Sequence, residues 1–354
     1  MTSLRTAVIG VGALGRHHAR ILSQLPNVEL VGVVDSNQQQ GESVAQACET
    51  TWFDSCEPLF DQVDAVSVVV PTVAHLAVAS QFLERGIGVL VEKPIASSVA
   101  EARQLVSLAD AHKAVLQVGH IERFNPAMKT ACASITNPKY IRAERVSPYT
   151  FRSTDIGVVL DLMIHDLDLI LAMVKSPIDS VEAFGVAIFG ETEDSAQARI
   201  RFRNGCIADL TASRVCPEAA RKMQVWSESG CSTIDFGART VSKFTPGSAL
   251  IAGEHIENPP ATIEARAEMM KSVFGRFIDV VAFPVEDGDA LTAELSEFVE
   301  CVRTGSDPTV SGKDGLAAIE AARLVLESIS AHCWDGSPAG RVGPRVTPAR
   351  LRVA

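Results

Sequence analysis

Three ionisable side chains stand at helical spacing near the middle of the chain: Asp161, His165 and Asp168. Residues four and three positions apart share one face of a helix, and this face adjoins an apolar seam. The seam consists of Leu160, Ile164, Leu167, Leu171 and Val174. A histidine there can accept a hydroxyl proton, and an aspartate one turn away can orient its ring or a sugar hydroxyl. The pattern predicts acid–base chemistry, with a structural aspartate–histidine pair at a helix start as the alternative. Asp166 points elsewhere and is expected to be structural.

A lysine follows an apolar run that predicts a buried strand. Residues 88–91 lead directly into Glu92-Lys93-Pro94, and ligands bind at the carboxyl ends of strands in a doubly wound sheet. A lysine at this edge could hold a substrate hydroxyl and stabilise the alkoxide that develops on it. The proline fixes the backbone that presents the lysine. A solvated loop lysine is the alternative.

A glycine-rich turn at the N-terminus predicts a dinucleotide site. Gly10, Gly12 and Gly15 follow a short apolar run, and Asp35 stands 20 residues past the last glycine, at the end of a second predicted strand, Val28–Val34. The glycines permit a tight turn, a close approach to pyrophosphate and packing of helix on strand. Asp35 can accept hydrogen bonds from ribose hydroxyls and repels a 2′-phosphate, so NAD is favoured over NADP. The predicted phosphate loop comprises Gly10, Gly12, Ala13, Leu14 and Gly15.

The elements around these residues predict two domains and a tail. Over residues 1–122 apolar strands alternate with helices, which predicts an α/β Rossmann domain with a doubly wound parallel sheet that binds NAD. Over residues 123–336 the segments resemble strands, with a hairpin signal at Asn204-Gly205, one helix near Leu160–Val174 and two late helices, at residues 289–304 and 313–330. We expect an α+β domain for substrate and oligomerisation, with a largely antiparallel open sheet. Residues 337–354, rich in Gly, Pro and Arg, are expected to form a mobile tail.

The overall composition excludes several classes of protein. The net charge of −11 argues against a general nucleic-acid binder or a protein of anionic membrane surfaces. There is no long apolar run and no signal-peptide pattern, which favours a cytoplasmic protein. The eight cysteines show no C-x-x-C pair and no zinc-site spacing, so we expect ordinary thiols and no metal.

Taken together and in order, these motifs resemble the Gfo/Idh/MocA oxidoreductases. The resemblance covers about residues 5–330 and rests on the glycine loop with His18, Pro71-Thr72 with His75, Glu92-Lys93-Pro94, and Asp161-x-x-x-His165. It implies that Lys93, Asp161 and His165 are catalytic. It also implies that the nucleotide contacts are the glycine loop, Asp35, Pro71, Thr72, His75, Glu92 and Lys93. Alternatively, His75 is a surface residue at a helix N-terminus and His18 a helix residue packed near the phosphate loop.

The string Ile121-Glu-Arg-Phe-Asn-Pro126 resembles one branch of that family, the UDP-N-acetylglucosamine 3-dehydrogenases. This resemblance implies an NAD-dependent enzyme that oxidises C3 of UDP-N-acetylglucosamine to the 3-keto sugar, ahead of amination for lipid A in some bacteria. Expected substrate contacts are Glu122, Arg123, Asn125 and Arg152. Glu122 and Arg123 could instead form an ion pair at the domain junction.

Two other functions remain open from the sequence. One is an inositol or free-sugar dehydrogenase, and the other is a non-catalytic NAD(P)-binding regulator. Retention of Lys93, Asp161 and His165 argues against the regulator, which has no need for all three. We also expect a homo-oligomer, a dimer or tetramer, that associates through the C-terminal sheet.

Overall fold

The computed structural model describes residues 3–151, 156–254, 260–335 and 342–344. These residues divide into two compact units. The first consists of residues 1–124, 167–169 and 288–324, and the second of residues 125–166, 170–287 and 325–354. Each unit contains its own sheet, and the two are described separately.

The first unit is built on a six-stranded parallel sheet in the order β3-β2-β1-β4-β5-β6. This order confirms the predicted doubly wound Rossmann fold. The strands are β1 (Leu4–Ile9), β2 (Val28–Val34), β3 (Thr51–Phe53), β4 (Ala65–Val68), β5 (Gly88–Glu92) and β6 (Leu116–Gly119). The connecting helices are α1 (Gly15–Gln24), α2 (Gln38–Ala47), α3 (His75–Leu83) and α4 (Val99–His112).

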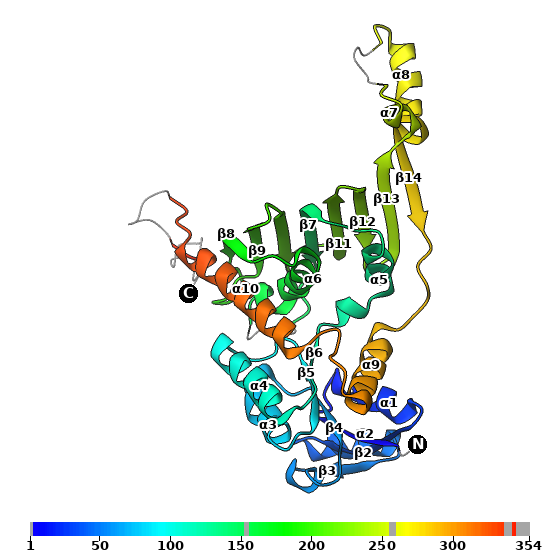
Figure 1. The fold of residues 1–354 in the computed structure, drawn as a ribbon. Coiled ribbons are helices and arrows are strands. Elements are labelled where there is room, and N and C mark those ends of the chain that lie inside the picture. The colour runs from blue at the N-terminus through cyan, green and yellow to red at the C-terminus, as the bar shows by residue number, and fades with distance from the viewer. Residues whose placement is uncertain (1–2, 152–155, 255–259, 336–341, 345–354) are drawn as a thin grey trace. The chain divides into compact units, whose positions relative to one another are not determined.

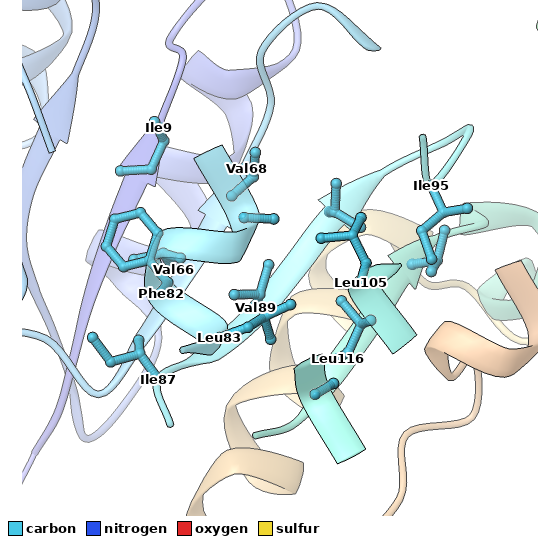
Figure 2. Packing of buried hydrophobic residues seen from close by; sticks show 14 of the residues in the cluster. Ile9, Val66, Val68, Phe82, Leu83, Ile87, Val89, Ile95, Leu105 and Leu116 are labelled. Carbon is cyan, nitrogen blue, oxygen red and sulfur yellow. The ribbon is translucent and has the colours of Figure 1, made fainter. Parts of the chain in front are cut away.

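The central strands are apolar on both faces because helices cover both sides of the sheet. One core contains Val66, Val68 and Val89 of the sheet together with Phe82 and Leu83 of α3, all without exposed surface (Figure 2). Local signals start the helices that build this layer. Ser98, for example, caps α4 by accepting a hydrogen bond from the Glu101 backbone N–H at 3.3 Å.

A late helix completes the first unit. Helix α9 (Ala290–Thr304) begins at Asp289, whose side chain accepts from the Thr292 backbone N–H, and ends at Gly305 in the left-handed conformation. Its residues Leu295 and Phe298 pack into the second core of the sheet, with Leu22 and Leu90. Residues 288–324 therefore pack with the first unit rather than with the expected continuous segment 123–336, since the sheet needs α9 to cover its apolar face.

The second unit contains an eight-stranded sheet in the order β14-β13-β12-β11-β7-β10-β9-β8. Its strands are β7 (Pro138–Val146), β8 (Ile178–Val186), β9 (Ser195–Phe202), β10 (Ile207–Ser213), β11 (Ala220–Ser227), β12 (Gly230–Asp235), β13 (Thr240–Pro246) and β14 (Ile278–Phe283). Its helices are α5 (Pro126–Cys132), α6 (Ile164–Val174), α7 (Ser248–Ile251) and α8 (Ile263–Ser272), and α10 (Gly312–Ala331) contributes residues to both units.

The sheet confirms the predicted largely antiparallel class and adds detail. The hairpin at Asn204-Gly205 joins β9 to β10, with Gly205 at φ +85°. Strands β7 and β10 are parallel, a pairing that the sequence did not predict. Strands β11 and β12 are antiparallel neighbours joined by a turn before Gly230. Most of the expected tail 337–354 lies outside the described residues.

Candidate active site

The glycine loop leaves open space at one glycine and none at the other two. A Cβ on Gly10, which has φ +86°, would lie 2.6 Å from the Val69 carbonyl oxygen, and a Cβ on Gly15 would collide with the Gly10 carbonyl. A Cβ on Gly12 would meet only the Gln40 side chain, at 3.8 Å. Gly10 and Gly15 are therefore required by packing, whereas Gly12 leaves the surface of the loop accessible to a ligand.

Helix α1 begins at this loop without a competing group at its N-terminus. Leu14 stands at the N-cap position, makes no side-chain capping bond, and the first turn holds no acidic residue. The first backbone N–H groups and the helix dipole are thus left to attract an anion. This arrangement fits the pyrophosphate of a dinucleotide.

Asp35 lies at the carboxyl end of β2 and also holds the loop. Its Oδ2 accepts from the Val11 backbone N–H at 2.9 Å, and its Oδ1 accepts from the Asn37 backbone N–H at 2.8 Å. The Gln40 amide donates to Oδ2 at 3.3 Å. These bonds fix the carboxylate where the sequence predicted a ribose contact and leave lone pairs for ribose hydroxyls. The sequence did not predict that Asp35 also accepts the hydrogen bond from Val11 that holds the loop.

Lys93 is presented by a buried polar chain that runs from β4 through α1 to Glu92. The Ser67 hydroxyl lies 2.8 Å from His18 Nδ1, and His18 Nε2 lies 3.3 Å from Glu92 Oε1. Glu92 Oε2 accepts from the Lys93 backbone N–H at 3.1 Å. Burial alone would raise the pKa of Glu92, but His18 and Lys93 outweigh it and hold that pKa below its usual value. His18 is fully buried, which fits the packed helix residue considered from sequence.

His75 clamps the backbone on the other side of Lys93. Its Nδ1 lies 3.0 Å from the Pro94 carbonyl oxygen and its Nε2 lies 3.0 Å from the Val70 carbonyl oxygen. Burial lowers the pKa of His75, so the ring is neutral and donates to one of the two carbonyls at a time. His75 is 1% exposed, and the surface alternative is therefore wrong. Pro71 and Thr72 precede it at the carboxyl end of β4.

A second buried polar group lies where α9 meets the sheet. The Gln117 side-chain amide donates to the Glu294 backbone carbonyl at 3.2 Å. Both carboxyl oxygens of Glu294 are buried without a hydrogen-bond partner among the residues described. Burial raises the pKa of Glu294 well above its usual value, and the charges of Glu92, Glu297 and Asp168 raise it further. Glu294 consequently keeps its proton to higher pH than Glu92 does.

Arg123 forms ion pairs inside the first unit. Its Nε lies 2.7 Å from Asp168 Oδ2, and its Nη2 lies 3.5 Å from Asp314 Oδ1. Asp168 is 1% exposed, so the third residue of the predicted acid–base face is engaged in a buried ion pair. This corrects the expectation of three available groups. Burial also lowers the pKa of the neighbouring His120.

In the second unit a π-helical turn, Val159–Met163, precedes α6 and carries Asp161. His165 follows in the first turn of α6, and both side chains are partly exposed. Glu193 holds the start of the turn, because its carboxylate accepts from the Val159 backbone N–H at 3.1 Å. Burial raises the pKa of Glu193. The sequence spacing assumed an ordinary α-helix and did not predict the wider turn.

Asp166 serves the structure, as the sequence predicted. Its carboxylate forms a bidentate pair with Arg145 of β7, at 3.1 Å to Nε and 2.8 Å to Nη2, and both side chains are buried. This pair anchors α6 on the sheet and so fixes the helix that carries His165.

The expected substrate contacts lie in different environments. Asn125 caps α5, accepting from the Ala127 backbone N–H at 3.0 Å, and its amide lies 3.5 Å from the Phe236 carbonyl. Glu122 is 7% exposed. Arg123 pairs with Asp168 and Asp314 rather than in the Glu122–Arg123 pair considered from sequence. Arg152 lies outside the described residues.

Sequence reasoning missed Ser67, Gln117 and Glu294. The signal for the first two was present, because each is a polar residue inside an apolar strand. Glu294 gave no such signal, since glutamate is common in helices.

Comparisons with known proteins place this geometry in a family. Residues 4–120 match the family described as "Oxidoreductase family, NAD-binding Rossmann fold", and residues 131–232 match the "GFO/IDH/MocA C-terminal domain". The chain belongs to the GFO/IDH/MocA oxidoreductases. It is an oxidoreductase whose cofactor is NAD, as the glycine loop and the uncapped α1 allow.

Two relatives are similar over nearly their whole length. The UDP-N-acetylglucosamine 3-dehydrogenase of Acidithiobacillus ferrooxidans is 34% identical over 94% of this chain and 99% of that protein. A solved structure of that enzyme covers 93% of this chain and 98% of its own, with a TM-score of 0.81. The scyllo-inositol 2-dehydrogenase (NAD(+)) of Bacillus subtilis is 28% identical, over 90% and 91% of the two chains.

Proposed function

We propose that this oxidoreductase oxidises the C3 hydroxyl of UDP-N-acetylglucosamine to a ketone, with NAD as the acceptor. The observation that carries the proposal is the 34% identity to an enzyme of that activity over almost all of both chains. The string Ile121–Pro126 adds support from the sequence. We also propose that the 3-keto sugar is then aminated in the cytoplasm, as a step in lipid A biosynthesis.

We assign catalytic roles to Lys93, Asp161 and His165, which this chain retains. His165 accepts the proton from the substrate hydroxyl. The Lys93 ammonium stabilises negative charge on the same oxygen, and Asp161 orients the two groups. When bound, NAD would supply the acceptor for the hydride that leaves the carbinol carbon.

The first unit would hold the cofactor through residues whose positions are described above. The backbone of the glycine loop, with Ala13 and Leu14, and the start of α1 bind the pyrophosphate. Asp35 binds the adenosine ribose, and Pro71, Thr72, His75, Glu92 and Lys93 line the nicotinamide side. In this proposal His18 and Ser67 are positioning residues, because they act on Lys93 through Glu92.

We further propose that Glu122, Arg123, Asn125 and Arg152 recognise the substrate, its diphosphate through arginine. The Arg123 guanidinium would contact the ligand while Asp168 holds it in place, so the position of the arginine would be fixed before the ligand binds. Asn125 would contribute through the α5 cap that it already forms.

The oligomer expected from sequence also remains a proposal, supported by the outer face of the second sheet. Glu182, Arg199, Asp209 and Arg142 stand opposite one another on four neighbouring strands, alternating in sign. The Arg199–Asp209 pair is 2.7 Å long. A row of alternating charges complements the same row on a second copy of the chain, so a two-fold axis can join them.

One assay tests substrate and roles together. The protein is incubated with NAD and UDP-N-acetylglucosamine, UDP-glucose, myo-inositol or scyllo-inositol, while absorbance of reduced cofactor is followed. We expect turnover of UDP-N-acetylglucosamine and a product lighter by two hydrogen atoms. Turnover of an inositol without any UDP-sugar would reject the substrate and favour the function of the Bacillus subtilis relative.

The catalytic assignment is tested with matched variants. Lys93→Ala and His165→Ala should each lower kcat by roughly 10²-fold or more, with NAD binding retained. Lys113→Ala and His112→Ala, at the exposed end of α4, are the controls and should keep activity. A His165→Ala enzyme within a few-fold of wild type would remove this histidine as the base.

A further inference from the structure

The second sheet carries an extension in which few of the described residues are buried, namely Val241, Gly247, Ala249 and Phe277. Strands β13 and β14 project past the other strands, with α7 and α8 at their far end (Figure 1). We call residues 240–283 the arm. No function described so far uses it.

Helix α8 of the arm has no buried residue. Ile263 is 79% exposed and Met270 is 73% exposed, and Phe274, just past the helix, is 59% exposed. An isolated helix of ten residues is marginal in water, since helices in proteins are stabilised mainly by packing of an apolar face. The exposed apolar side chains of α8 therefore indicate a surface that is covered in the assembled protein.

The apolar residues form one narrow face. Ile263, Ala267 and Met270 are at positions i, i+4 and i+7, which lie on one side of a helix. The small Ala267 at the centre permits a second helix to approach closely. We propose that this face packs antiparallel against the same face of α8 in a second copy of the chain, which makes the arm a self-association element.

Charge placement favours a second copy in this orientation. Glu264 and Lys271 are seven residues apart, so both lie on the same flank of the apolar face. In an antiparallel pair related by a two-fold axis, Ala267 faces its own copy, Ile263 faces Met270, and Glu264 faces Lys271 twice. Lys271 Nζ lies 3.2 Å from Glu268 Oε2 of its own helix in an exposed pair, so a contact with Glu264 of the copy would compete with that pair. Arg266 on the other flank donates to the Pro260 carbonyl of its own chain at 2.7 Å, which draws it away from the contact.

The net charge of the arm also fits a protein partner of this kind. The arm contains five acidic and four basic residues, within a chain of net charge −11. A surface for nucleic acid or anionic lipid would show a basic excess. A nearly neutral apolar element can instead meet its copy without charge repulsion. This inference shares with the proposed function the assumption that the protein forms a homo-oligomer. It does not depend on which substrate the enzyme oxidises.

Cysteine cross-linking tests the contact in the full-length protein. Ala267→Cys places a thiol at the centre of the proposed contact, whereas the control Ala265→Cys places one on the opposite side of α8. Under mild oxidation, Ala267→Cys should give a covalent dimer on a non-reducing gel, above the wild-type background. The Ala265→Cys control should remain at that background.

Charge exchange tests the orientation. Glu264→Lys or Lys271→Glu should each weaken dimerisation about five- to tenfold by sedimentation, because each makes two like-charge contacts. The double variant Glu264→Lys/Lys271→Glu should restore it. Dimers or tetramers in solution without Ala267→Cys cross-linking would overturn the arm contact and leave the sheet-face association standing. A monomer at all concentrations would overturn both, and equal cross-linking at 265 and 267 would also overturn the arm contact. In each case the dehydrogenase assay is a separate readout.

Discussion

Glu294→Gln isolates the energetic effect of a buried acid in the NAD-binding unit. Glu294 is fully buried in α9, and its pKa is raised well above the usual value by burial and by the nearby charges of Glu92, Glu297 and Asp168. In the unfolded chain the same group has a pKa of about 4.3. Between these two pKa values the native state binds a proton that the unfolded state has released.

The sign of the pH dependence follows from that proton. Stability falls as pH rises wherever the native state holds more protons than the unfolded state. The contribution of Glu294 is therefore fully present below about pH 4 and is lost progressively above it. The slope is about 1.4 kcal/mol per pH unit until the folded pKa is reached. The pKa of Glu92 is lowered, so its own effect on stability falls at pH values below the usual carboxyl pKa. It therefore does not mask the effect of Glu294 at higher pH.

Denaturant unfolding at a series of pH values measures the effect. Trp52, in β3 of the first unit, is the reporter, in a background where Trp226 and Trp334 are phenylalanine. From pH 5 upward, the free energy of unfolding of Glu294→Gln should rise relative to that of its parent by about 1.4 kcal/mol per pH unit. Glu300→Gln is the control, because Glu300 lies on the same helix in an exposed pair with Arg303, at 2.9 Å. Parallel curves for Glu294→Gln and its parent would refute the reasoning.

Four further substitutions test other parts of the structure. We expect the protein to bind NAD at least about tenfold more tightly than NADP, a difference of about 1.4 kcal/mol. Asp35→Ala should narrow this preference and should also weaken NAD binding, because the Val11 backbone N–H loses its acceptor. Calorimetry with both cofactors measures the two affinities. Gly15→Ala should destabilise the first unit by about 1–3 kcal/mol, which thermal unfolding measures. Gly12→Ala should change stability by no more than about 0.5 kcal/mol and should reduce NAD affinity, which calorimetry measures. Asp166→Ala should cost about 3–5 kcal/mol, because Arg145 loses its buried partner, and a melting temperature close to wild type would contradict that role.

The first sheet was predictable because its strands are apolar on both faces and its turn residues are distinctive. Strand β2 has the predicted bounds, Val28–Val34, and the glycine loop leads into α1 as expected. The short β3 has one exposed residue and two partly exposed ones, so its sequence gives no apolar run. The place of α9 in this unit depends on packing between residues more than 270 positions apart, since one buried core contains both Leu22 and Phe298. Local pattern does not encode such pairings.

The candidate site was predictable where chemistry depends on residue type and spacing. Gly10, Asp35 and Lys93 stand at strand ends, as their motifs indicated. The buried connections among polar residues were not predictable, since Ser67, His18 and Glu92 meet only through the fold. The role of Asp168 was mispredicted for the same reason, because Arg123 is 45 residues away in sequence.

The return of α9 to the first sheet has a consequence for how the chain is made. Synthesis proceeds from the N-terminus, and domains generally fold as they emerge. Here residues 1–124 emerge with one face of their sheet lacking Leu295 and Phe298, and nearly 170 residues must follow before those side chains exist. The nascent NAD-binding unit thus carries an apolar surface while residues 125–294 are synthesised. The second sheet can form during that interval, so most of the second unit is synthesised before the first unit, which begins earlier on the ribosome, is complete.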